Sequence, residues 1–133
     1  MANERANLSK TEARIMNFMW AVKKPVVLAE VKEYFREKYN KPYANSTIHT
    51  LLQRMVKKGY IAQGEKYIAF SGYSYRCVVS EEEYMLEQME MYRNTFFDGS
   101  AGDFILSLMK MQEMTAEELD RIGKYVQERK MIS

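Results

Sequence analysis

The sequence predicts a mainly α-helical protein with one small β-hairpin, divided into two parts. Apolar residues recur at helical spacing before residue 59 and again after residue 80. The stretch between these regions is rich in aromatic and β-branched residues and is interrupted by glycines, as is typical of a hairpin. Residues 1–76 carry 14 Lys/Arg and 6 Asp/Glu, whereas residues 77–133 carry 6 and 12. This charge division suggests a polyanion-binding part and a second part, so we expect domains at residues 1–79 and 80–133.

The composition is that of a globular protein, with 47% hydrophobic and 29% charged residues. No apolar run approaches the roughly 20 residues that cross a membrane, and the N-terminal stretch lacks the apolar core of a signal peptide. Cys77 is the single cysteine, which rules out an internal disulfide framework and suits a reducing compartment. We therefore expect a cytoplasmic protein without membrane insertion.

The N-terminal part is predicted to begin with three helices. Ser9 and Glu12 form a capping-box pattern at the start of the first helix. The apolar period resumes over residues 27–38 for the second helix. Asn45 is a suitable N-cap for the third helix, and Gly59 is placed to end it. Three helices followed by a hairpin over residues 60–79 give the order of a winged helix-turn-helix domain.

The C-terminal part is predicted to hold three further helices. Ser80 and Glu83 form a capping-box pattern, residues 97–102 form a loop, and Thr115 and Glu118 begin the last helix. Three helices of about 50 residues in total cannot bury their apolar faces well alone, so we expect them to pack against a second copy as a dimerisation domain. The residues expected at this seam are Met85, Met89, Tyr92, Phe96, Phe104, Ile105, Leu108, Leu119, Ile122 and Val126.

The outward face of the third helix gathers short polar side chains near its start. A recognition helix places its N-terminal residues at base edges in the major groove, where hydroxyls bond and a Thr methyl contacts thymine. His49 and Thr50 are the expected base readers, and Gln53 shares their face. The alternative is a solvated polar face, which the charge division and the neighbouring elements disfavour. The expected positioning residues, some of which can bond phosphate, are Asn45, Ser46, Thr47 and Arg54.

The hairpin supplies a second expected contact with DNA. Lys66 and Tyr67 lie near its tip, where a wing meets the phosphate backbone or the minor groove, and Ser71 and Tyr73 can assist. Cross-strand packing is the alternative role for the aromatic residues, and it is favoured for Tyr73 and Tyr75.

The sequence offers no chemistry of an enzyme, a metal site or a cofactor site. The acidic residues 81–83 stand at a helix start, without a nucleophile, phosphate loop or cofactor motif. His49 has no histidine partner. The eleven methionines include soft Cu(I) ligands in principle, but most lie on the apolar seams as adaptable filling.

Several stretches together resemble the penicillinase repressor family, which includes β-lactamase, methicillin-resistance and copper-transport repressors. They are LSKTEARIMNFMW (8–20), STIHTLLQRMVKKGYI (46–61), VSEEEY (79–84), FFDGSAGDFILSLM (96–109) and MTAEELDRIGKYV (114–126). The resemblance implies a homodimeric repressor on dyad DNA operators, commonly with TACA/TGTA-like half-sites. Thr47, Thr50 and Arg54 fall on the family's DNA-contacting helix, and His49 stands where arginine is common.

The resemblance also bears on induction. The β-lactam-responsive repressors are cut by a membrane protease at an Asn-Phe bond, and the aligned pair here is Ser107-Leu108. The partners expected from the resemblance therefore include a regulatory protease. The copper repressors carry a C-terminal cysteine hook, which the stretch YVQERKMIS lacks.

The sequence thus predicts a homodimeric transcriptional repressor that blocks a promoter by occupying a palindromic site. A winged-helix protein-interaction module without sequence-specific DNA readout is the alternative from another class. Nonspecific nucleic-acid binding is a second alternative, which predicts salt-sensitive affinity without operator preference.

Overall fold

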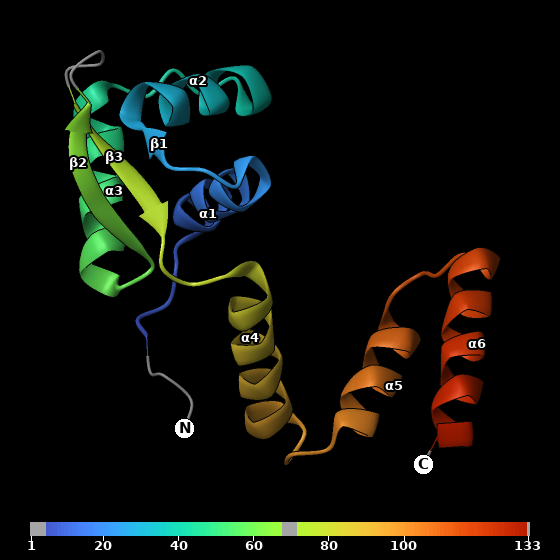
Figure 1. The fold of residues 1–133 in the computed structure, drawn as a ribbon. Coiled ribbons are helices and arrows are strands. Elements are labelled where there is room, and N and C mark those ends of the chain that lie inside the picture. Colours follow the sequence, from blue (N-terminus) through green and yellow to red (C-terminus); the bar gives the residue numbers. More distant parts are fainter. Residues whose placement is uncertain (1–4, 68–71, 133) are drawn as a thin grey trace. The chain divides into compact units, whose positions relative to one another are not determined.

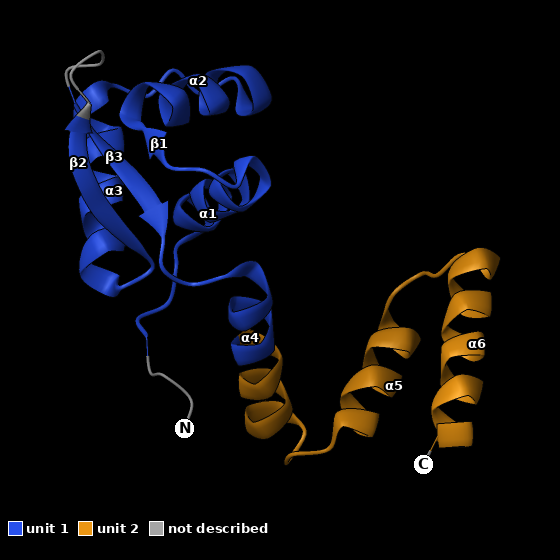
Figure 2. Ribbon diagram, viewed as in Figure 1, with its two compact units in different colours: residues 1–87 blue, residues 88–133 orange. Residues whose placement is uncertain are grey.

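The protein is described by a computed structural model, which covers residues 5–67 and 72–132 (Figure 1). The side chain of Tyr67 and all of Ser71 lie outside the described part. The chain divides into two compact units, residues 1–87 and 88–133, and the boundary falls within helix α4 (Glu81–Phe96) (Figure 2).

The N-terminal unit combines helices with a small antiparallel sheet, and the predicted mainly helical winged-helix fold is confirmed. The predicted hairpin is present, and its second strand also pairs with a short strand that the sequence did not predict. In the described residues the strand order is β1-β3-β2, with Val26 opposite Tyr75. The elements are α1 (Lys10–Val22), β1 (Val26–Val27), α2 (Leu28–Tyr39), α3 (Asn45–Lys58), β2 (Ile61–Tyr67) and β3 (Gly72–Cys77).

The core of this unit lies between the three helices and the sheet. The helical periods predicted from the sequence supply its side chains, and each large apolar side chain buried there contributes about 1.5–3 kcal/mol of transfer free energy. The core also contains Met16 in α1, Tyr60 just after α3 and Val79 just after β3. The fully buried apolar residues of the helices are Ile15, Met16, Met19, Val31, Phe35, Ile48, Leu52 and Met55.

The start of α1 and both ends of α3 can be compared with the caps that the sequence predicts. Ser9 and Glu12 form both hydrogen bonds of the predicted capping box. Gly59 ends α3 with a φ of 87°, as predicted. The expectation that Asn45 is the N-cap is wrong, because Ala44 occupies that position and offers no side-chain acceptor. Asn45 instead begins the helix, and its Oδ1 accepts a hydrogen bond of 2.9 Å from Lys32 Nζ in α2.

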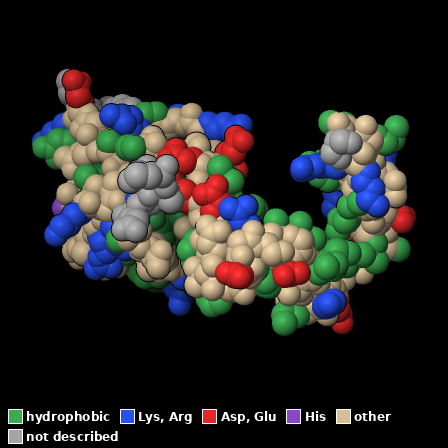
Figure 3. Space-filling model, turned by 90° about the horizontal axis from the view of Figure 1, so that it is seen from below, with side chains coloured by type: hydrophobic (Ala, Val, Ile, Leu, Met, Phe, Trp, Pro, Cys, Tyr) green, Lys and Arg blue, Asp and Glu red, His purple; other side chains and the backbone are tan. Residues whose placement is uncertain are grey.

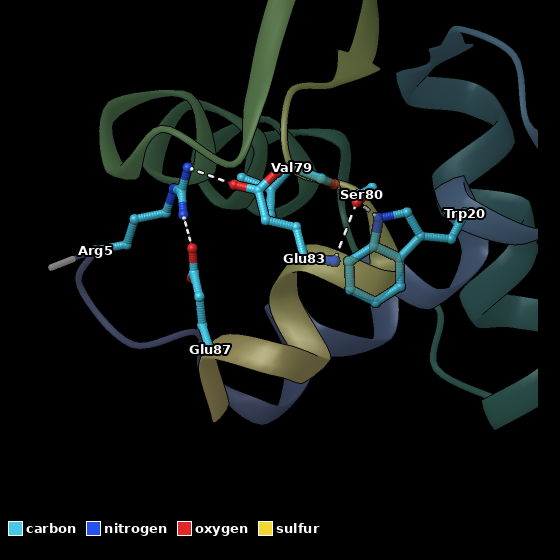
Figure 4. A network of polar contacts seen from close by, with 6 residues as sticks. All are labelled: Arg5, Trp20, Val79, Ser80, Glu83 and Glu87. Atoms are coloured by element: carbon cyan, nitrogen blue, oxygen red, sulfur yellow. Dashed lines mark hydrogen bonds and ion pairs between the residues drawn. The ribbon is translucent and has the colours of Figure 1, made fainter. Parts of the chain in front are cut away.

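The start of α4 is attached to the N-terminal unit. Ser80 Oγ accepts a hydrogen bond of 3.1 Å from Glu83 N, while the Glu83 carboxylate pairs with Arg5. Only the Ser80 half of the predicted capping box is therefore formed. Trp20 Nε1 in α1 donates to Val79 O at 3.0 Å, just before the helix begins (Figure 4).

The C-terminal unit consists of the rest of α4, α5 (Ala101–Met111) and α6 (Ala116–Ile132). Phe104 stacks on Phe97, with ring centroids 5.1 Å apart. Thr115 and Glu118, which were expected to begin the last helix, form both bonds of a capping box, at 3.1 and 3.0 Å. Over the described residues, none of the three helices contains a buried side chain. No helix in the described ranges is long and apolar enough to span a membrane.

Candidate nucleic-acid interface

The predicted recognition face lies on the outer side of α3. The opposite face is fixed in the core, since Ile48, Leu52 and Met55 are 0% exposed. This anchoring leaves the short polar side chains and Arg54 directed away from the core. The exposed side chains of α3 include the six that the sequence predicted as DNA contacts, namely Asn45, Ser46, Thr47, His49, Thr50 and Arg54.

The structure sorts these six residues into two neighbouring groups. Ser46, Thr47, Thr50 and Arg54 line one shallow concavity together with Leu51. Asn45 and His49 line a larger one, which also contains Lys32 of α2 and Lys66 and Tyr73 of the hairpin. One group is therefore confined to α3, whereas the other joins α3 to α2 and the wing.

Thr50 is held in a defined orientation by its own helix. Its Oγ1 donates a hydrogen bond of 2.9 Å to Ser46 O, one turn earlier. The hydroxyl hydrogen is thereby engaged, but the oxygen lone pairs and the methyl group stay accessible on the exposed side chain. Thr50 can thus accept a hydrogen bond or contact a thymine methyl, and both interactions suit base reading.

Lys32 is a candidate contact that the sequence analysis did not single out. It lies in α2, and its ammonium group binds Asn45 Oδ1 beside the start of α3. Arg36 lines the same concavity, but its Nε donates to Glu33 Oε2 at 2.9 Å, so its charge is partly compensated. No local sequence pattern indicates Lys32, because only the packing of α2 on α3 brings it to Asn45.

Gln53 connects the helix to the wing. The sequence placed it on the outward face, but it is half-buried. Its Nε2 donates to Gln63 Oε1 at 2.8 Å and lies 3.2 Å from the Tyr75 hydroxyl. Gln53 therefore orients the hairpin against α3.

The wing places Lys66 in β2 opposite Tyr73 in β3, and both side chains are exposed. Tyr75 is only 2% exposed, so its predicted packing role is confirmed. The exposed fraction of Tyr73 is 45%, and its side chain is available to a partner. The predicted contacts of the Tyr67 and Ser71 side chains lie outside the described residues.

Lys58, in the basic last turn of α3, has a structural role. Its Nζ donates to Glu12 Oε1 at 2.7 Å and to Asn7 O at 2.8 Å. Lys57 is exposed on the outer side of the helix. Of these two neighbouring lysines, Lys57 is therefore the one free to face a polyanion.

The sequence comparisons decide the family. Residues 8–128 match the family described as penicillinase repressor. The chain belongs to the penicillinase repressor family.

Its relatives include the penicillinase repressor of Staphylococcus aureus, 25% identical over 126 residues with 92% of each chain covered. The methicillin resistance regulatory protein MecI of Staphylococcus aureus strain N315 is 23% identical over 122 residues, covering 92% of this chain and 94% of MecI. A complex structure of hsRosR-SG has a TM-score of 0.51 at 16% identity, with 94% of both chains covered. RosR of H. salinarum has a TM-score of 0.50 at 16% identity with full coverage, and both structures support the fold alone.

Membership in the penicillinase repressor family places the chain among DNA-binding transcriptional repressors, which are regulators and not enzymes. The residues of the interface suit binding without covalent chemistry. Cys77 is half-buried, and burial raises the pKa of its thiol, which disfavours the reactive thiolate. No group of three His, Cys, Asp or Glu residues that could hold a metal occurs within residues 5–67 and 72–132.

Proposed function

We propose that this repressor is a homodimer that occupies a palindromic DNA operator, with α3 in the major groove and the wing on the backbone. The observation that carries the proposal is the outer face of α3, where exposed hydroxyls, His49 and Arg54 stand over a fully buried apolar face. A helix anchored in this way presents its side chains in one fixed arrangement. Base discrimination needs such an arrangement, since each bidentate or apolar contact depends on its position.

The roles within the interface follow from side-chain chemistry. His49 and Thr50 are assigned to base edges, because both are exposed on the first turns of α3. Lys32 joins the assigned backbone contacts, because it stands with His49 and Lys66 around one concavity. The remaining backbone contacts are assigned to Asn45, Ser46, Thr47, Arg54 and Lys66, and to Tyr67 from its position in the sequence.

The proposed dimer is supported by the apolar faces of the C-terminal unit. Phe96, Leu108 and Val126 are 65%, 55% and 43% exposed, and hydrophobic side chains extend along these helices (Figure 3). A second copy would cover such a surface, and exposed apolar patches of this kind commonly mark interaction sites. Two copies then place two recognition helices on half-sites about one helical turn apart. The TACA/TGTA-like half-site, a cytoplasmic location and a regulatory protease acting near Ser107-Leu108 are proposed from the resemblance.

The test is fluorescence anisotropy with a TACA/TGTA dyad duplex and a scrambled duplex across a salt series. A specific repressor prefers the dyad by at least about 10³-fold, and its binding to both duplexes weakens as salt rises. The double substitution His49→Ala, Thr50→Ala should remove most of that preference. Asn17→Ala, an exposed polar change on α1, is the matched control and should leave it unchanged.

The other outcomes would support different functions. Equal, salt-sensitive binding to both duplexes would contradict the proposed readout of this dyad and indicate nonspecific binding or another operator. Binding to neither duplex at low salt would contradict DNA readout and favour the protein-interaction alternative.

A further inference from the structure

Residues 5–8, here called the N-terminal strap, lie between the end of α3 and the start of α4. On the α3 side, Lys58 Nζ donates to Asn7 O and the Tyr60 hydroxyl donates to Ala6 O, both at 2.8 Å. On the α4 side, the guanidinium of Arg5 binds Glu83 and Glu87. The strap is thus bonded through its backbone to the recognition helix region and through its first side chain to α4.

The two bonds of Arg5 form a fork across one turn of α4 (Figure 4). Nη1 lies 2.6 Å from Glu87 Oε1, and Nη2 lies 3.2 Å from Glu83 Oε2. Two glutamates four residues apart on a helix repel one another. The guanidinium of Arg5 offsets this repulsion, because it forms an attractive ion pair with each carboxylate. The side chains of Arg5 and Glu87 are only 16% and 19% exposed, so solvent screens this pair less than an ordinary surface pair.

Few other contacts hold the first turns of α4. The Tyr84 ring lies 5.7 Å from Trp20 and 5.9 Å from Tyr60, measured between ring centroids. None of the described side chains of α4 is buried. In the described residues, the Arg5 fork and the Tyr84 ring contacts together hold residues 81–87 of this helix within the N-terminal unit. The same helix continues without a break from Glu81 to Phe96, into the C-terminal unit.

We propose that Arg5 is a positioning residue that fixes the direction of α4 relative to α3, and thereby sets the half-site spacing that the dimer accepts. The proposal rests on the proposed dimeric operator binding. A firm connection between recognition helix and dimer helix keeps two α3 helices at one separation. A loosened connection lets each α3 find its half-site at several separations, which broadens the spacing preference.

The experiment compares the full-length protein with its Arg5→Ala variant on dyads whose half-sites are separated by the best-bound spacing, or by one base pair more or fewer. One base pair rotates a half-site by about 35°. Wild type should disfavour each altered spacing by about tenfold or more, and Arg5→Ala should reduce this discrimination to about twofold. Affinity for a duplex with one half-site should be the same for both proteins.

Three further variants separate positioning from charge and stability. Lys10→Ala removes a positive charge from the exposed first turn of α1 and should leave the spacing preference unchanged. Arg5→Glu combined with Glu83→Lys and Glu87→Lys reverses the fork and should restore most of the preference. Glu87→Gln weakens the fork from the α4 side and should broaden the preference as Arg5→Ala does, even where Arg5→Ala folds poorly.

The results distinguish failure of this proposal from failure of the proposed function. Wild type that prefers the dyad, alongside Arg5→Ala with an unaltered spacing preference, would overturn the role of Arg5 alone. Equal weakening on all spacings, with a lower unfolding temperature, would likewise show that Arg5 only stabilises the fold. Wild type without any preference for the dyad would overturn the operator function and, with it, this proposal.

Discussion

At the scale of single residues, Glu12 joins the start of α1 to the end of α3. Its side chain is 0% exposed, and Oε1 accepts hydrogen bonds from Ser9 N and Lys58 Nζ, both at 2.7 Å. Oε2 is buried without a hydrogen-bond partner in the described part of the chain. A buried carboxylate with half of its oxygens unpaired depends strongly on the one cation that reaches it.

The Glu12–Lys58 pair gives a prediction for stability and its pH dependence. Burial raises the pKa of Glu12, but the hydrogen bonds from Lys58 and Ser9 outweigh burial, so the pKa lies below its ordinary value of 4.5. A lowered folded-state pKa contributes stability above the unfolded-state pKa, and this contribution is lost as pH falls through the folded-state pKa. Glu12→Gln should therefore flatten the fall in stability below about pH 4.5, measured by urea unfolding with Trp20 fluorescence.

Removing the other partner should be more damaging than removing the charge. Lys58→Met leaves the buried Glu12 carboxylate uncompensated, so we expect a loss of about 3–5 kcal/mol in the free energy of unfolding at pH 7. Lys57→Met, one residue earlier and exposed, is the matched control and should cost far less. Similar losses in both variants would show that the ion pair with Glu12 does not stabilise the fold.

Thr50 offers a residue-scale test of base reading. Thr50→Ala removes both methyl and hydroxyl and should weaken specific binding by about 1–3 kcal/mol without changing nonspecific binding. Thr50→Val keeps a methyl group and should lose less, if that group contacts thymine. Anisotropy titrations on the dyad measure both, and equal losses in the two variants would argue against a methyl contact.

At the scale of elements, the wing depends on a close approach at Gly64. A Cβ at this position would lie 2.5 Å from Ser74 Oγ on the neighbouring strand. Ser74 is itself only 9% exposed, and its hydroxyl donates to Glu65 O at 3.3 Å. The strand register also shifts between Gln63 and Lys66. A side chain at position 64 would therefore displace the Ser74 hydroxyl, whereas the Ser74 backbone oxygen, at 3.6 Å, lies at an ordinary contact distance.

The prediction is that Gly64→Ala destabilises the N-terminal unit by about 1–3 kcal/mol, as overpacking does. Gly72→Ala, in the partner strand and with no described atom within 4 Å of the added Cβ, should be nearly neutral. Adding Ser74→Ala to Gly64→Ala should recover part of the loss, because the clashing hydroxyl is gone. Chemical unfolding followed by Trp20 fluorescence provides the measurement, since this single tryptophan lies in the N-terminal unit.

At the scale of the whole molecule, function is proposed to need two copies. Leu108→Glu places a charge in the apolar face of α5, where the side chain is 55% exposed in the single chain. We expect this variant to be monomeric by analytical ultracentrifugation and to lose at least about tenfold in dyad affinity. Trp20-monitored stability should stay unchanged, because Leu108 lies outside the N-terminal unit.

Lys110→Glu is the control for that substitution. It introduces the same acidic side chain on α5, but helical spacing places it away from Phe104, Ile105 and Leu108. The control should remain a dimer. A monomeric wild type, or a Leu108→Glu variant that stays dimeric, would show that these α5 residues do not form the dimer contact.

The sequence by itself determined the helices, the hairpin and the family of this protein. Some features depend only on residues that are close in the sequence, so a local pattern reveals them. They are the helical periods, the capping boxes Ser9–Glu12 and Thr115–Glu118, and the glycine at position 59. The exposure of Ser46, His49 and Thr50 followed from the same periodicity, because a buried stripe on one face defines the outer face, whereas Gln53, expected on that face, is half-buried.

Only the tertiary structure decided which polar groups pair across the fold. Arg5 and Glu87 are 82 positions apart, and Glu12 and Lys58 are 46 apart. The sequence contains 20 Lys/Arg and 18 Asp/Glu, so local pattern cannot select these partners from the rest. The pairing of β1 with β3, and of Lys32 with Asn45, likewise required packed helices to bring distant residues together. Local sequence therefore determines where elements begin and which face of each helix is apolar. Long-range packing determines which charged side chains pair within the protein and which are left to contact DNA.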